Sequence, residues 1–290
     1  ARNNIWNVSS ESQGVQTLFS SKISVKPLKN GLNIDKLIEV IKIETKPIYI
    51  NKEINNNSEK LLEIPLFDMH FGIADLDYYK DTYSRIEHKI KSAKRDTILF
   101  IIGQDLLHND GFEGKTTSGT MIDKVDMDKA WNDADTFYTN LIKVALSNSS
   151  KVNVIYSNGN HDKGISYGFV KMLEAKFPQV EFESSMKQRK AFMYHEVFIG
   201  ITHGDKGGVR MTKNFYAEYG KDIANASVVE VHSGHLHHEK SKDDLGFLVR
   251  TLATGAKTDL YHYDNGWVGA HKRFQLFEYS KDSLDGIYYV

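Results

Sequence analysis

Five short segments between residues 68 and 237 carry side chains that can bind metal ions. Carboxylate, carboxamide and imidazole groups together are typical ligands of manganese, iron and zinc. The segments are Asp68-Met69-His70, Gly103-Gln104-Asp105-Leu106-Leu107-His108, Gly159-Asn160-His161-Asp162, His203-Gly204-Asp205 and Gly234-His235-Leu236-His237. A carboxylate can bridge two cations, and such a pair can activate water for attack on a phosphate ester. The residues therefore predict hydrolysis of phosphate esters at a two-metal centre.

The composition narrows the kind of site. Cysteine is absent, so a thiolate site is excluded. The segments contain too many histidines for a pure magnesium or calcium site, because those ions prefer oxygen ligands. Each segment follows an apolar run that is typical of a buried strand, and ligand sites gather at such strand ends in α/β sheets.

In this order the segments resemble the calcineurin-like metallophosphoesterase superfamily. The strings GQDLLHND and GNHD are most similar to its SbcD-type DNA-repair nucleases. The stretches LLHNDGFEGKTTSGTMIDKVD and TDLYHYDNGWVGAHKRFQLF resemble an uncharacterised phage and prophage group of these nucleases. The resemblance covers the chain from about Leu61 to the C-terminus. It implies an α/β fold, a four-layer αββα sandwich with two mixed sheets.

The resemblance also implies two divalent metal ions and a ligand set for each. Manganese is the expected ion, with iron, zinc or nickel as alternatives. Asp105 would bridge the ions, and the other ligands would be Asp68, His70 and His237 for the first and Asn160, His203 and His235 for the second.

Two further histidines have catalytic roles by the same resemblance. His161 would stand beside the leaving group, as transition-state stabiliser or general acid, and His108 would orient His161 or the substrate. Gln104 departs from the pattern, since the nucleases commonly have glycine there, and we expect it to act as a strand-end backbone site. We expect Asp162 to cap or orient its neighbours. A structural or solvent-exposed position is the expectation for His88, His195, His232 and His271.

The predicted function is that of a metal-dependent phosphodiesterase, a DNA nuclease or exonuclease that uses a metal-activated hydroxide. The alternative is a hydrolase of cyclic nucleotides or other small phosphodiesters, and a regulatory or binding module is a third interpretation. SbcD-type nucleases act with an ATPase, but a long C-terminal docking extension is not recognisable here, so an obligate ATPase partner is not expected. The oligomeric state stays open.

Charge and hydropathy add constraints. The 290-residue chain has a formal net charge of −1, which gives no global attraction to nucleic acid. Local cations could still meet a DNA backbone; the candidates are Lys187, Arg189, Lys190, Lys206 and Arg210. No stretch approaches the ~20 apolar residues of a membrane span. We therefore expect no membrane contact and a cytoplasmic location, in a bacterium or a phage-infected cell.

Two parts of the chain differ in pattern. Residues 1–60 are expected to form an N-terminal appendage and linker, with one or two strands in 15–25 and a helix from Asn33 to about Glu44. Residues 61–290 are expected to form the metallophosphoesterase domain, in which strands alternate with helices at 78–93, 128–146 and 168–177. Its Gly- and Thr-rich loop at 111–125 is a candidate for shaping the substrate site. An aromatic cluster could stack a base or simply pack, and it comprises Tyr261, His262, Tyr263 and Trp267.

Overall fold

The computed structural model describes residues 2–22, 34–51, 58–258, 263, 266 and 269–290. The chain divides into two compact units, Ala1–Ile34 and Asp35–Val290. Within the described residues, no helix has both the length and the apolar character needed to cross a membrane.

The first unit contains an antiparallel hairpin. Strand β1 (Arg2–Ser10) pairs with β2 (Gly14–Lys22) in an unbroken register from Arg2↔Lys22 to Ser10↔Gly14. Gly14 closes the turn at φ 67°, a backbone conformation that glycine adopts without steric cost. The sequence predicted the second of these strands and missed the first, whose polar residues interrupt its apolar ones.

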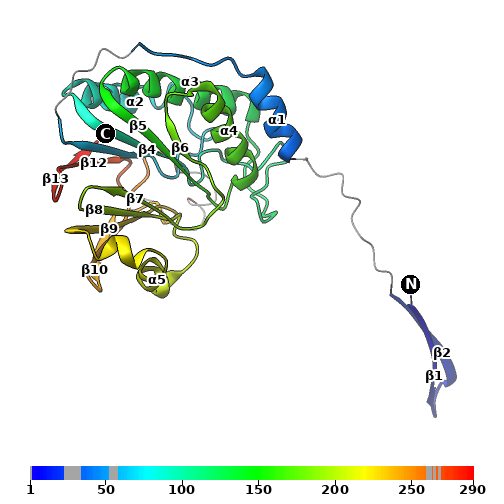
Figure 1. The fold of residues 1–290 in the computed structure, drawn as a ribbon. Coiled ribbons are helices and arrows are strands. Elements are labelled where there is room, and N and C mark those ends of the chain that lie inside the picture. The colour runs from blue at the N-terminus through cyan, green and yellow to red at the C-terminus, as the bar shows by residue number, and fades with distance from the viewer. Residues whose placement is uncertain (1, 23–33, 52–57, 259–262, 264–265, 267–268) are drawn as a thin grey trace. The chain divides into compact units, whose positions relative to one another are not determined.

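The second unit is built on two mixed sheets (Figure 1). The first has the order β13-β12-β3-β4-β5-β6, and its strands are β3 (Leu61–Pro65), β4 (Arg95–Gly103), β5 (Ser149–Ser157), β6 (Glu181–Glu183), β12 (Gln275–Tyr279) and β13 (Leu284–Tyr289). The second has the order β10-β11-β9-β8-β7, formed by β7 (Lys190–Tyr194), β8 (Val197–Ile201), β9 (Val228–Ser233), β10 (Lys240–Asp244) and β11 (Phe247–Thr251). Strands β3 to β6 run parallel, as do β8, β9 and β11.

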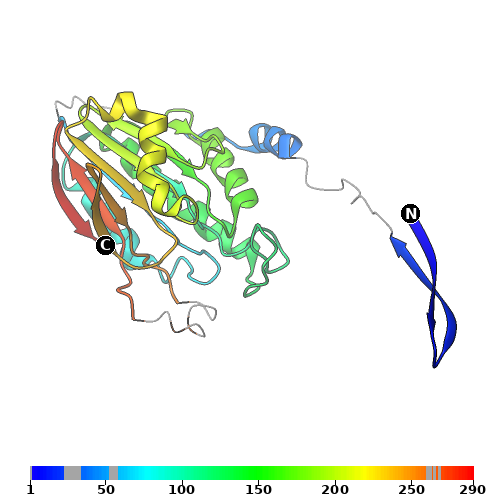
Figure 2. The ribbon, with the colours of Figure 1, turned by 90° about the horizontal axis from the view of Figure 1, so that it is seen from below.

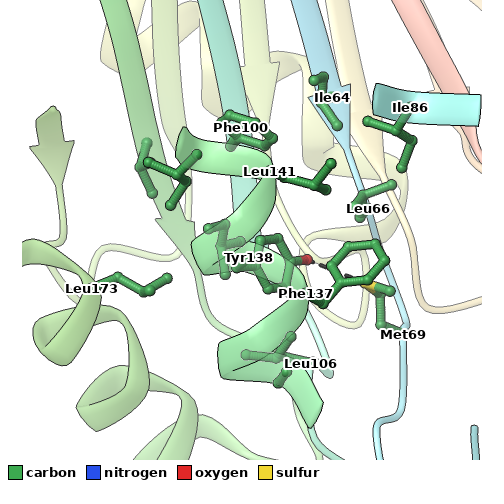
Figure 3. Close-up of a cluster of buried hydrophobic side chains, with 14 of the residues drawn as sticks. Ile64, Leu66, Met69, Ile86, Phe100, Leu106, Phe137, Tyr138, Leu141 and Leu173 are labelled. Atoms are coloured by element: carbon green, nitrogen blue, oxygen red, sulfur yellow. Dashed lines mark hydrogen bonds between the residues drawn. The ribbon is translucent and has the colours of Figure 1, made fainter. Parts of the chain in front are cut away.

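Helices cover the outer faces of both sheets. Helices α2 (Lys80–Lys91), α3 (Met127–Leu146) and α4 (Lys163–Lys176) pack on the six-stranded sheet. Figure 3 shows this layer, where Tyr138 and Leu141 of α3 face Phe100 of β4. Helix α5 (Met211–Ile223), yellow in Figures 1 and 2, packs on the five-stranded sheet. The predicted four-layer αββα sandwich is therefore confirmed.

The sheets face each other across a third buried cluster, which includes Leu99 of β4 and Ile199 of β8. Alternation explains the layering, because Ile98, Phe100 and Ile102 point the other way, toward the helices. Burial on both faces accounts for the continuous apolar run of β4.

The boundary between the units differs from the expected one near Lys60. Helix α1 (Ile34–Glu44) has the predicted extent, and its predicted apolar residues Leu37, Ile38 and Ile41 are half-buried. Beyond it, the Ile48 N–H donates to the Lys176 carbonyl (2.8 Å). Ile48 and Ile50 also pack against the core under α4. The segment 35–51 belongs to the second unit because it buries these apolar side chains there.

Candidate metal centre

The strands bring the predicted site residues to their carboxyl ends. Asp68 and His70 come after β3, Asp105 and His108 after β4, Asn160 and His161 after β5, His203 after β8, and His235 and His237 after β9. All five strands have a parallel neighbour in their sheet. Both sheets therefore contribute to a single site, as expected where parallel strands end together.

The backbone of these segments is strained. Eight non-glycine residues of the described chain have positive φ, and six of them lie here, with φ from 47° to 70°. They are Asp68, His70, Gln104, Asp105, His235 and His237. Each such residue costs on the order of 1–2 kcal/mol. This concentration of strain is typical of functional sites, where the surrounding structure holds residues in unfavourable conformations.

Main-chain hydrogen bonds hold two of the segments side by side. The N–H of Asp68 donates to the carbonyl of Gln104 (2.8 Å), and that of His70 donates to Asp105 (3.0 Å). The buried side chain of Gln104 donates to Ser157 Oγ (3.0 Å) and does not point into the ligand cluster. Gln104 is thus a strand-end backbone residue, as its position suggested.

Two glycines of the motifs allow close approach to the carboxylates. A Cβ at Gly159 would lie 1.9 Å from Asp105 Oδ1, and a Cβ at Gly234 would lie 2.4 Å from Asp68 Oδ2. Any side chain at either position would collide with a carboxylate. Because no side chain intervenes, each carboxylate accepts a main-chain hydrogen bond. The N–H of His161 donates to Asp105 Oδ1 (2.7 Å), and that of His235 donates to Asp68 Oδ2 (2.8 Å).

The first ligand group consists of Asp68, His70 and His237, whose ligand atoms all lie within 4.8 Å of one another. His237 Nε2 is 3.3 Å from His70 Nε2 and 3.5 Å from Asp68 Oδ1. Two imidazole nitrogens and a carboxylate oxygen thus converge on one point, an arrangement suited to a cation.

The second group consists of Asp105, His203 and His235, again within 4.8 Å. His203 Nε2 lies 3.2 Å from Asp105 Oδ2 and 2.8 Å from Asn160 Oδ1. The structure therefore brings together all four residues expected around the second ion. A third cluster contains His70, His108 and His161 at the same spacing.

Burial and neighbouring charges shift the pKa values of these groups. Burial, reinforced by His161 and His237, holds the pKa of His70 well below its usual value. Burial opposes ionisation of Asp105, but the charge of His203 outweighs it and the pKa of Asp105 falls well below normal. Burial would lower the pKa of His203, yet Asp105 raises it to about 9. Asp105 and His203 thus each favour the charged form of the other, as a carboxylate and a nearby cation do.

Buried atoms without hydrogen bonds test whether a metal fits the site. Among the described residues, the buried side-chain atoms without a hydrogen-bond partner include Asp68 Oδ1, which belongs to the first ligand group. Leaving such atoms unsatisfied costs about 1–3 kcal/mol each, more for a charged group. The clustered nitrogen and oxygen donors, with no thiolate, suit a divalent transition metal. The residues present therefore fit metal ions at both groups.

The predicted catalytic histidines lie beside the ligand groups. The ring centroid of His161 is 4.8 Å from that of His70 and 5.4 Å from that of His108. His161 Nδ1 lies 3.1 Å from the main-chain carbonyl oxygen of His108. A carbonyl only accepts, so Nδ1 carries the hydrogen and Nε2 is the atom left to exchange a proton. His108 holds His161 through its backbone, while its own ring lies against His70, with the two Nδ1 atoms 3.4 Å apart.

Two supporting residues were missed in the sequence. The Thr254 hydroxyl donates to the Asp68 carbonyl (2.6 Å). The only available signal was its place just after an apolar strand, β11. Asp110 bonds to the start of α4, and its signal was the Asn109-Asp110 pair at the beginning of the loop.

Two of the proposed DNA-contacting cations form bonds within the chain. Arg189 forms a two-pronged ion pair with Glu218. Lys190 is 3% exposed, and its ammonium donates to the Glu183 carbonyl (3.1 Å). The prediction is wrong for Lys190, because it is buried, and it stays a prediction for Arg189, whose side chain is 25% exposed.

The remaining predictions have mixed outcomes. Lys187, Lys206 and Arg210 are exposed. His232 is buried and structural, as expected. Asp162 does not cap α4, but its Oδ2 accepts the Leu107 N–H (2.7 Å), so it orients a neighbour. Of the aromatic cluster, Tyr263 is exposed, and Tyr261, His262 and Trp267 lie outside the described residues.

Comparison with known proteins gives structural neighbours only. No family model matches the chain, and no curated protein matches it. An uncharacterized protein from Streptococcus pneumoniae TIGR4, described as a predicted phosphoesterase, has 13% identity and a TM-score of 0.37, over 80% of this chain and 89% of that chain. An archaeal phosphodiesterase has 10% identity and a TM-score of 0.40, over 80% and 99%. Vps29 from Entamoeba histolytica, solved with zinc, has 16% identity and a TM-score of 0.34, over 80% and 98%.

Proposed function

We propose that this chain is a metal-dependent phosphodiesterase that binds two divalent ions. Asp68, His70 and His237 would hold one ion, Asn160, His203 and His235 the other, and Asp105 would bridge them. Manganese is the proposed ion, with iron, zinc or nickel as alternatives. When bound, the ions supply activated water and neutralise charge that develops on the phosphate. The observation that supports this most is the meeting of two ligand groups from two sheets, with a buried Asp68 oxygen that lacks a hydrogen bond.

His161 would assist departure of the leaving group. Its Nδ1 is engaged by the His108 carbonyl, so an imidazolium would donate its Nε2 proton to the departing oxygen. Its main-chain N–H is fixed on Asp105, which ties the position of the acid to that of the bridging carboxylate. The geometry thus couples proton transfer to the place where the phosphate would bind.

The proposed substrate is DNA, with a nuclease or exonuclease activity. Support comes from the sequence resemblance and from the exposed Lys187, Lys206 and Arg210, the last two of which follow His203 within seven residues. A phosphate backbone bound by such cations would show a salt dependence of about 0.7–0.9 in log K per log salt for each contact.

A cyclic nucleotide or other small phosphodiester is the second candidate. The observation that favours it is the internal pairing of Arg189 and Lys190, which leaves fewer cations for an extended backbone. The same metal centre would serve this substrate, because the chemistry at phosphorus is unchanged.

A substrate panel tests the proposal and separates the two candidates. The metal-reconstituted protein would be assayed on single- and double-stranded DNA, RNA, cyclic nucleotides and an aryl phosphodiester. We expect a DNA preference of orders of magnitude and a KM for DNA that rises with salt. Activity on cyclic nucleotides alone would select the second candidate, and no hydrolysis with any metal would reject a phosphodiesterase.

A further inference from the structure

The turn between β5 and α4 carries Asn160 and His161 in irregular backbone. Helix α4 begins at Lys163, and Asp162 in the preceding position makes no side-chain hydrogen bond to it. The first N–H groups of a helix have no partner within the helix and need one from elsewhere. The start of α4 therefore depends on another segment of the chain.

That segment is the loop between β4 and α3, and Asp110 is its first contact. Asp110 Oδ1 accepts the N–H of Gly164 (3.0 Å) and of Ile165 (2.9 Å). A Cβ at Gly164 would lie 3.0 Å from the same oxygen, so the glycine permits this close approach. A carboxylate here also interacts favourably with the positive end of the helix dipole. Asp110 thus caps α4 although its two bonds span 54 and 55 residues of the sequence.

Thr117 supplies a second contact from the same loop. Its main-chain N–H donates to the carbonyls of His161 (3.1 Å) and Asn160 (3.3 Å). Its hydroxyl oxygen accepts the N–H of Lys163 (2.9 Å). The loop therefore bonds to the peptide groups of both predicted functional residues of the turn.

Bonds also run in the opposite direction, from the turn to the end of β4. Asp162 Oδ2 accepts the Leu107 N–H (2.7 Å), and the His161 N–H reaches Asp105 Oδ1 (2.7 Å). The turn between β5 and α4 is thus hydrogen-bonded both to the loop before α3 and to the residues just after β4.

The loop is itself ordered by internal bonds, so it can hold the turn in place. The N–H of Asp110 donates to Lys115 O (2.8 Å), and the fully buried Asn109 bridges the loop ends. Its amide donates to Asp123 O (2.9 Å), and its oxygen accepts the Val125 N–H (3.1 Å).

We propose that Asp110 and Thr117 are positioning residues that fix His161 and Asn160 for the reaction. The proposal rests on the phosphodiesterase function above. A displaced acid loses catalysis steeply, since a shift of about 1 Å can cost about 10²-fold in rate. The loop at 111–125 would then contribute to catalysis by holding the turn rather than by shaping the substrate site.

Substitutions in the full chain test the positioning role of Asp110 and Thr117, and a second helix-capping residue serves as the control. Asp110→Ala removes both bonds to α4, and Asp110→Asn keeps an acceptor oxygen. Thr117→Val removes one bond at an exposed position, where loss of folding is not expected, and Thr117→Ser restores it. Asp126→Ala is the control, because Asp126 likewise caps a helix, α3, by accepting the Lys129 N–H (3.1 Å).

We expect Asp110→Ala to lower kcat about 10- to 100-fold, the usual loss on removing a residue that supports a metal ligand. KM for an aryl phosphodiester should stay unchanged, and the loss should grow with a poorer leaving group. Thr117→Val should show a smaller loss of the same kind. Asp110→Asn and Thr117→Ser should recover most of the activity, and Asp126→Ala should keep kcat.

Hydrogen exchange of the metal-free protein gives a readout that does not need activity. Amides of residues 158–166 should exchange faster in Asp110→Ala and in Thr117→Val than in the wild type or in Asp126→Ala. Faster exchange in a protein that hydrolyses no phosphodiester would show that Asp110 and Thr117 hold the turn, and it would reject the proposed function. An active enzyme whose Asp110 and Thr117 variants match Asp126→Ala in kcat and exchange would overturn the positioning role.

Discussion

Two sets of polar or charged side chains lie where the two sheets meet. The inner set is Glu63 of β3, Glu230 and His232 of β9, and Arg250 of β11, and the outer set is the seven predicted metal ligands just past the strand ends. The inner set is fully bonded. His232 lies 2.9 Å from both Glu63 and Glu230, and Arg250 donates to Glu230 through two nitrogens. The outer set, with Asp68 and His235, has strained backbone and a buried carboxylate oxygen that lacks a hydrogen bond.

The difference in bonding between the two sets indicates that they have different roles. The inner set joins the two sheets with two acids and two bases, and it is complete without any ligand. The outer set is built from similar residue types, but its donor atoms converge in two groups, at a cost in strain and desolvation. We infer that the inner set stabilises the sandwich and that the outer set is completed only by cations.

The largest effect is expected from the outer set, with Asp105→Asn. Removal of the charge that both ions would share should abolish nearly all hydrolysis and lower metal content, while the protein stays folded. Activity assays with elemental analysis would measure this. An Asp105→Asn protein that keeps two ions and most of its activity would contradict a metal centre that depends on a shared carboxylate.

His161→Asn should keep both ions and lower kcat by about 10²–10⁴, the range for a positioned proton-transfer group. The loss should shrink with p-nitrophenol as leaving group, because it departs without a proton. His108→Ala should lose less, since the hydrogen bond to His161 comes from the main chain of His108. Equal losses for good and poor leaving groups would show that His161 is not the acid.

In the inner set, Glu230→Gln should destabilise the fold by about 3–5 kcal/mol, because it removes the carboxylate that pairs with Arg250. Urea unfolding measures this, with kcat of the folded fraction as the second readout, which should not change. The matched control is Glu239→Gln, whose ion pair with Arg273 is about one-third exposed and should contribute about 0–1 kcal/mol. Equal effects of the two variants would show that the inner set has no special part in stability.

The pH dependence of unfolding should be the smallest of these effects. Burial lowers the pKa of His232, but Glu63 and Glu230 outweigh it and raise the value to about 9, against 6.5 when unfolded. Burial raises the pKa of Glu230, but bonds from His232 and Arg250 lower it to about 2, against 4.5.

Because the pKa of His232 is raised in the folded protein, this residue stabilises the fold fully below pH 6.5. Its contribution is lost as the pH rises through 9. Because the pKa of Glu230 is lowered in the folded protein, this residue stabilises the fold fully above pH 4.5. Its contribution is lost as the pH falls toward 2. Thermal unfolding should therefore show the inner set at full strength from about pH 4.5 to 6.5, and a loss on the order of 3 kcal/mol toward pH 9 and above. His232→Gln should flatten this alkaline decline, and an unchanged decline in that variant would assign it to other groups.

Local patterns in the sequence were sufficient for much of the fold. The apolar runs predicted the central strands, and residues directly after those runs proved to be neighbours. The helices α1, α2 and α3 followed from apolar spacing within a few residues. The start of α4 was placed too late, because its first residues Lys163 to Tyr167 mix polar and apolar types and its cap comes from Asp110.

Other features depend on residues far apart in the chain. Arg189 and Glu218 are 29 positions apart, and Glu63 and His232 are 169 apart, so no local pattern indicates either pair. The boundary near Lys60 was placed on a change in composition, whereas the packing of Ile48 and Ile50 decided the observed one. Helix α5 was missed although Phe215 and Ile223 mark its buried side, because glycines and polar residues surround them.

Diffraction from crystals grown with manganese would show whether the outer set binds two ions. Anomalous density at the manganese edge would locate the ions without reference to the protein atoms. We expect two peaks, one among Asp68, His70 and His237 and one among Asn160, His203 and His235, with Asp105 between them. A single peak at saturating manganese, or Asp105 turned away from both peaks, would contradict a two-metal centre.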